Sequence, residues 1–132
     1  MPIDQGEFSA NEAWLLFQLN NAPVKTEADG DFNAVAIMEI ASGMIFGMEL
    51  VPVVESEMSE LQSRKLLSAA ESQANSRPRL LFIPSDREAN HLDAVASKMG
   101  IVVERLPASE FVSLTKEAIE GFAAHVSGER YQ

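Results

Sequence analysis

The 132-residue chain contains no cysteine, and it carries only half as many basic as acidic side chains. The lack of cysteine excludes disulfide-stapled scaffolds, thiolate zinc sites and thiol nucleophiles. Ten basic against twenty acidic residues give a net charge of −10. Because a field of that sign repels phosphate backbones, we expect no binding to nucleic acid. No apolar run approaches the roughly 20 residues of a membrane-spanning helix, so we also expect no membrane association.

The start of the chain lacks the basic and apolar segments of a signal peptide, so we expect a cytoplasmic protein. Its composition, 46% hydrophobic and 23% charged, is typical of an ordinary globular domain. The length fits a single domain over residues 1–132. We expect its two ends, residues 1–10 and 127–132, to be flexible.

Residues 34–40 and 44–51 are the clearest predicted strands, because both are rich in Val, Ile and Met. Only Ala41-Ser42-Gly43 separates them, which favours a tight hairpin. Both segments are apolar on their two faces, so we expect this hairpin inside a covered sheet. Residues 79–84 and 101–105 are predicted as two further strands, the first of the buried parallel type.

The segment Trp14-Leu15-Leu16-Phe17-Gln18-Leu19 has two interpretations. It is short and apolar on all sides, as a central strand is. However, Ser9-Ala10-Asn11-Glu12 has the spacing of a capping box, which would begin a helix there instead. We favour the strand.

Three helices are predicted further along the chain. The first covers about residues 57–74 with Ser56 as its cap. The second begins at the apparent capping box Ser85-Asp86-Arg87-Glu88 and ends at Gly100. The third follows Pro107 and Ser109 and buries an apolar stripe: Phe111, Leu114, Ala118, Ile119 and Phe122. The predicted order is therefore three strands, helix, strand, helix, strand, helix.

Candidate catalytic groups are few. His91 and His125 have no histidine partner at metal-ligand spacing, so surface solvation explains both, and we expect neither a metal nor a cofactor. Glu39 and Glu49 are acids within apolar strands, but the expected pairing separates them by roughly 13 Å, so each is expected to reach solvent near a strand end. Asp86 follows a predicted parallel strand, where open α/β sheets place their sites. As the first-turn acid of a helix it also has a purely structural explanation.

The strand order and several short motifs resemble the ribonuclease-H-like core of retroviral-type integrases and transposases over about residues 13–120. The motifs are Trp14-Leu15-Leu16-Phe17, Glu39-Ile40-Ala41-Ser42-Gly43-Met44-Ile45-Phe46-Gly47, Arg77-Pro78 and Ser85-Asp86-Arg87. The resemblance implies a three-layer α/β fold with a mixed five-stranded sheet, element order β-β-β-α-β-α-β-α and strand order 3-2-1-4-5. In that family three acids hold two metal ions that activate water for phosphodiester chemistry.

Carried over position by position, the family's second acid matches Asp86, and its third would be Glu117 or Glu120. The first acid, in the family's Trp-x-x-Asp strand, falls on Phe17, which cannot bind a cation. Glu88 replaces the glycine that follows the family's second acid. The chain is also similar, over nearly its whole length, to an uncharacterised bacterial domain family with no known activity.

We therefore expect a non-catalytic binding or interaction module on a ribonuclease-H-like scaffold. Its partner would be another protein or a second copy of the chain. One alternative is a metal-dependent nuclease or phosphodiesterase that uses Glu39 and Asp86 together with Glu117 or Glu120. Another is a small-ligand-binding domain with its site at the carboxyl ends of the strands.

Overall fold

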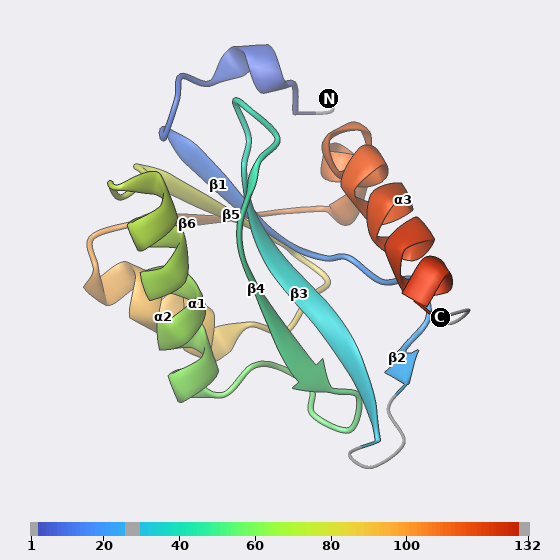
Figure 1. Ribbon diagram of the computed structural model, residues 1–132. Coiled ribbons are helices and arrows are strands. Elements are labelled where there is room, and N and C mark those ends of the chain that lie inside the picture. Colours follow the sequence, from blue (N-terminus) through green and yellow to red (C-terminus); the bar gives the residue numbers. More distant parts are fainter. Residues whose placement is uncertain (1–2, 26–29, 130–132) are drawn as a thin grey trace.

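The computed structural model describes residues 3–25 and 30–129 and shows a mixed α/β fold around a six-stranded mixed sheet. Its strands are β1 Ala13–Gln18, β2 Val24–Lys25, β3 Asp31–Glu39, β4 Ile45–Pro52, β5 Leu80–Pro84 and β6 Val102–Leu106. Its helices are α1 Glu60–Ala74, α2 Asn90–Lys98 and α3 Val112–Glu129, with the short 3-10 helices η1 Gln5–Glu7 and η2 Ala108–Phe111. Helices α1 and α2 lie on one face of the sheet and α3 on the other (Figure 1).

Strand β1 lies in the middle of the sheet, so the strand interpretation of this segment is confirmed. It pairs antiparallel with β3 and parallel with β5. Strand β3 also pairs antiparallel with β4, and β5 pairs parallel with β6. Strand β2 adds a short antiparallel pair at the start of β3, which the sequence analysis missed. The sheet therefore has six strands instead of the expected five.

Two separate hydrophobic cores explain why β1 is apolar all round. Trp14 and Leu16 point into the core under α1 and α2. Leu15 and Phe17 point into the core under α3. Successive side chains of a strand alternate between its faces, so a strand covered on both sides needs apolar residues at consecutive positions.

Strand β4 is not covered on both faces, contrary to expectation. Helix α1 packs on one face so closely that a Cβ added at Gly47 would lie 3.1 Å from Leu66 Cδ1. On the other face, three side chains remain 38–47% exposed and do not belong to the core under α3: Ile45, Met48 and Leu50. Strand β4 forms an edge of the sheet, since its only strand partner in the described chain is β3. A bulge near Ile37 also interrupts the register of the hairpin, and beyond it Met38 lies opposite Ile45.

Helix α1 begins at Glu60, three residues later than expected. Its N-cap is Ser59, not Ser56, because Ser59 and Gln62 form a reciprocal capping box. The Gln62 N–H donates to Ser59 Oγ at 3.1 Å, and the Ser59 N–H donates to Gln62 Oε1 at 3.2 Å. The spacing of three residues between a serine and a glutamine sets the start of this helix, and Ser59 has that spacing to Gln62.

We expect Ser59→Ala to lower the free energy of unfolding by about 1 kcal/mol, since it removes one half of this capping box. Ser56→Ala is the matched control, because Ser56 is an exposed serine outside the helix. Its effect should stay within about 0.5 kcal/mol. Urea denaturation of the two variants measures both values, and a larger effect at Ser56 would contradict the assigned cap.

The predicted capping box at Ser85 is wrong. Helix α2 begins at Asn90, after Ala89, and has no side-chain cap. Residues 85–88 instead form a turn that is bonded to β6, where the Ser85 N–H donates to the Leu106 carbonyl at 2.7 Å. The Arg87 N–H closes the turn by donating to the Pro84 carbonyl at 3.1 Å. Asp86 therefore does not lie in the first turn of a helix, and its structural explanation no longer applies.

The amino-terminal residues that the structure describes pack on the α3 side of the sheet. The Ile3 N–H donates to the Glu110 carbonyl at 2.9 Å, and Phe8 contacts the core edge-on at Phe82. Of the ends that were expected to be flexible, residues 1–2 and 130–132 lie outside the described residues. No described helix is both long and apolar enough to cross a membrane.

Candidate functional site

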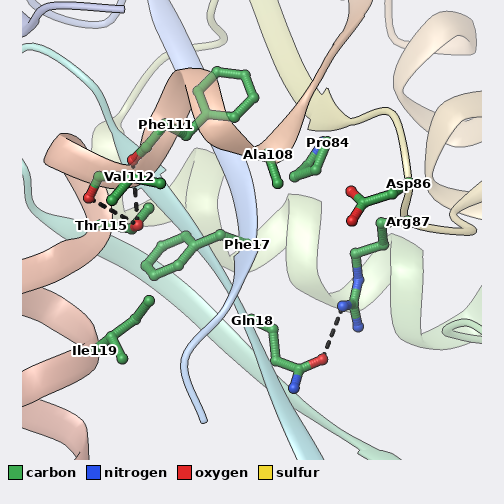
Figure 2. A pocket seen from close by; sticks show the side chains of 10 residues that line it. All are labelled: Phe17, Gln18, Pro84, Asp86, Arg87, Ala108, Phe111, Val112, Thr115 and Ile119. Carbon is green, nitrogen blue, oxygen red and sulfur yellow. Dashed lines mark hydrogen bonds between the residues drawn. The ribbon is translucent and has the colours of Figure 1, made fainter. Parts of the chain in front are cut away.

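A pocket of about 330 Å³ lies where β1 and β5 end, beneath the start of α3. Because β1 and β5 run parallel, their carboxyl ends meet at the same edge of the sheet. This is the edge at which open α/β sheets usually bind ligands. Figure 2 shows its lining side chains, and the pocket is open to solvent on one side.

The inner part of the pocket is apolar. Phe17 from β1 and Phe111 from η2 are almost fully buried, with 4% and 3% of their surface exposed. Val112 and Ile119 of α3 extend this lining. Thr115 offers little to a ligand as a donor, because its hydroxyl already donates to the Phe111 carbonyl at 3.2 Å.

Polar groups gather at the other end of the pocket, on the turn after β5. The Asp86 carboxylate is exposed and is directed into the pocket (Figure 2). It accepts no hydrogen bond from any residue that the structure describes. The neighbouring Arg87 is partly buried, and its Nη1 donates to Gln18 Oε1 at 2.9 Å. A carboxylate, a guanidinium and an amide therefore border one small cavity.

Arg87 is an incompletely compensated cation. Desolvation lowers the pKa of its guanidinium below its ordinary value, while the charge of Asp86 raises it. Within residues 3–25 and 30–129 it forms no ion pair, and its side-chain partner is the neutral amide of Gln18. Burying a charge without a paired counter-charge is unfavourable, so an anionic group bound there would relieve the cost.

Arg105 of β6 holds this turn in place. Its Nη1 donates to the Arg87 carbonyl at 2.6 Å and to the Pro84 carbonyl at 3.3 Å. Its Nη2 lies 3.9 Å from Asp93 Oδ2 of α2. The backbone that carries Asp86 is therefore tied to two neighbouring elements of the fold.

Phe17 and Asp86 border the same pocket, as the central position of β1 beside β5 requires. Here an aromatic ring contributes to the apolar wall of the pocket (Figure 2).

Glu39 lies far from this pocket, at the other end of the sheet. It pairs with Trp14 at the start of β1, whereas the pocket lies beyond the end of that strand. Four residue positions along β1 separate Trp14 from the end of the strand that borders the pocket, a distance of roughly 13 Å. The prediction that Glu39 reaches solvent is wrong, because the residue is only 6% exposed. Its carboxylate accepts hydrogen bonds from the Asn11 N–H and from the Ser42 hydroxyl.

The other candidate residues do not gather around Asp86. Glu117 borders a different cavity, next to Ser42 of the hairpin, and Glu120 is an exposed residue of α3. Glu49 is partly buried on β4. Within the described residues, no group of three acidic, histidine or cysteine side chains is placed to hold a metal ion.

The two histidines lie on different helices. His91 is half exposed, and its Nε2 is 3.8 Å from Glu57 Oε1 of the loop before α1. His125 is exposed on α3. Neither borders the pocket beside Asp86.

Sequence reasoning missed two polar residues of the pocket, Gln18 and Arg87. A signal for Gln18 exists, because it is the lone polar residue of the apolar segment 14–19. Arg87 directly follows Asp86, so its nearness to the pocket could have been inferred as well. The contribution of α3 could not, since it depends on how that helix packs across the sheet.

Comparison with known proteins identifies a family for this chain. A family model described as Domain of unknown function (DUF6930) matches residues 14–122. This span contains every residue that lines the pocket. A search of curated proteins finds no match. The chain belongs to the DUF6930 family, in agreement with the expected likeness to an uncharacterised domain family.

Proposed function

We propose that this DUF6930 domain is a non-catalytic binding module that takes a small molecule with an apolar body into the pocket between β1, β5 and α3. The observation that carries the proposal is the pocket's composition, an apolar interior bordered by the Asp86 carboxylate, which accepts no hydrogen bond from the described residues. Small-molecule sites have this composition, with a few polar groups that orient a largely apolar ligand. A volume of about 330 Å³ suits a compact ligand, near the lower limit of such sites.

We further propose that the scaffold is ribonuclease-H-like. The pairings of β4 with β3, β3 with β1, β1 with β5 and β5 with β6 support this, as does the placement of helices on both faces. On such a scaffold, Phe17 would replace the first catalytic acid.

A metal-dependent nuclease receives less support. That alternative needs Glu39 and Asp86 in one site, but these residues lie at opposite ends of β1. Glu39 also has its carboxylate engaged by Asn11 and Ser42. A small-molecule site needs Asp86 alone among the candidate acids.

Indole, a neutral and compact aromatic molecule, is a suitable first probe of the pocket. We expect its addition to shift the backbone amide resonances of Phe17, Gln18 and Thr115 in a nitrogen-15 correlation spectrum of the full chain. These three residues line the pocket, and an aromatic ring placed beside them changes their local magnetic environment.

Ala108→Trp should abolish these shifts. Ala108 is an exposed residue on the pocket wall, so the larger side chain can fill the cavity without entering the core. Leu61→Trp is the control, because Leu61 is 63% exposed on α1. Equal indole-induced shifts in both variants, or no shifts in the unsubstituted protein, would refute the proposed site.

A further inference from the structure

Two side chains of opposite charge border the pocket. Asp86 and Arg87 are consecutive residues, and both line the cavity, yet they form no ion pair. Figure 2 shows the Asp86 carboxylate directed into the pocket, while the Arg87 side chain extends toward Gln18. The pocket therefore presents a hydrogen-bond acceptor of negative charge and a donor of positive charge side by side.

Arg87 retains donors for a ligand. A guanidinium has five N–H donors, and the side-chain contact to Gln18 is the one hydrogen bond that the described residues accept from it. Guanidinium groups bind carboxylates through paired, charge-assisted hydrogen bonds. Asp86, with both of its oxygens free of hydrogen bonds from the described chain, can accept from an ammonium group in the same way.

We infer that the ligand is a small zwitterion, of the class of α-amino acids with an apolar side chain. Its carboxylate would face Arg87, its ammonium group would face Asp86, and its side chain would pack against Phe17 and Ile119. This inference rests on the proposed function, because it needs the pocket to be a ligand site.

Ligands that carry one charge fit the pocket less well. An anion would meet Arg87 but would be repelled by Asp86 and by the net charge of −10. A cation would meet Asp86 but would compete with Arg87 for the one charge that offsets the desolvation of this guanidinium. A zwitterion satisfies both groups and adds no net charge.

The test compares three molecules that share one aromatic ring: L-phenylalanine, phenethylamine, which lacks the carboxylate, and 3-phenylpropionate, which lacks the ammonium group. Titrations of the full chain, followed through the amides of Phe17 and Thr115, give three dissociation constants. We expect L-phenylalanine to bind about tenfold more tightly than either analogue, since each analogue leaves one charged group unpaired.

Asp86→Asn supplies the matched variant. It keeps the size of an exposed side chain, so the fold is retained, but it removes the negative charge. We expect it to weaken L-phenylalanine about tenfold. The affinity for 3-phenylpropionate should stay unchanged or rise.

The outcomes separate this inference from the proposed function. If all three molecules bind equally, or if 3-phenylpropionate binds most tightly, the zwitterion assignment is wrong while the pocket remains a binding site. If none of them binds and indole also fails to bind, the proposed function itself is wrong.

Discussion

Trp14→Ala is expected to lower the free energy of unfolding by about 3 kcal/mol, near the lower end of the usual range for large-to-small core substitutions of aromatic residues. Trp14 is completely buried in the central strand β1. Its ring packs edge-on against Phe46, with centroids 6.0 Å apart and an interplanar angle of 75°. Truncation to alanine leaves a cavity beneath α1 and α2.

The expected loss of unfolding free energy lies near the lower end of the usual range because the native Trp14 side chain is itself unfavourable in one respect. Its buried Nε1 has no hydrogen-bond partner within the described chain. An unsatisfied buried donor costs about 1–3 kcal/mol, and the substitution removes that cost together with the ring.

Urea denaturation of Trp14→Ala measures this effect, with Leu61→Ala as the control. Leu61 is 63% exposed on α1, and its truncation should change the free energy of unfolding by less than about 0.5 kcal/mol. Equal losses in the two variants would contradict the central position of β1.

Glu39→Ala is expected to destabilise the protein by a similar amount, about 3 kcal/mol. The Glu39 carboxylate accepts from the Asn11 N–H and from the Ser42 hydroxyl, and so connects the turn before β1 to the β3–β4 hairpin. Hydrogen bonds to charged groups contribute about 1.5–3 kcal/mol each, and part of that loss is recovered when water reaches the freed donors.

The reason for an acid at this position is local backbone geometry. Asn11 adopts a left-handed conformation with φ 59°, and its N–H points to the Glu39 side chain. Without that acceptor, the turn before β1 loses a main contact. We therefore expect the Asn11 amide to exchange with solvent faster in Glu39→Ala than in the unsubstituted protein.

Glu49→Ala is the matched control for Glu39→Ala. Glu49 is a partly buried acid of β4 that accepts no hydrogen bond from the described residues. Its removal should change the free energy of unfolding by no more than about 0.5 kcal/mol. If the two substitutions cost the same, the structural role assigned to Glu39 is wrong.

Much of the sheet could be predicted from the sequence, because the burial of a strand determines its pattern of apolar residues. Strand β1 is apolar at consecutive positions since each of its faces meets a core, and this pattern identified it despite a competing capping box. The competing residues have a different role, in which the Ser9 N–H donates to Glu12 Oε1 at 3.0 Å in the turn before the strand.

The predictions that failed depended on contacts between distant segments. Ser85 and Glu88 have the spacing of a capping box, but the Ser85 N–H donates to the backbone of β6 instead. The side chain of Arg105 donates to the Pro84 and Arg87 carbonyls of the same turn. No local pattern reveals such a contact. Likewise, the apolar composition of β4 does not reveal that one of its faces is left uncovered at the edge of the sheet.

The candidate site was only partly accessible from the sequence. The position of Asp86 after a parallel strand indicated the edge of the sheet at which this pocket lies. The pocket itself requires Phe111 and Ile119, whose places depend on how α3 crosses the opposite face. The polar end of the pocket also depends on the contact between Gln18 and Arg87, which are 69 positions apart in the sequence.

The most direct test of the account is a crystal structure of the full chain grown with L-phenylalanine. The account predicts electron density for the molecule in the pocket beside Asp86, with its ring against Phe17 and its carboxylate within hydrogen-bond distance of the Arg87 guanidinium. Density for the molecule at another place on the protein, with this pocket empty, would contradict it.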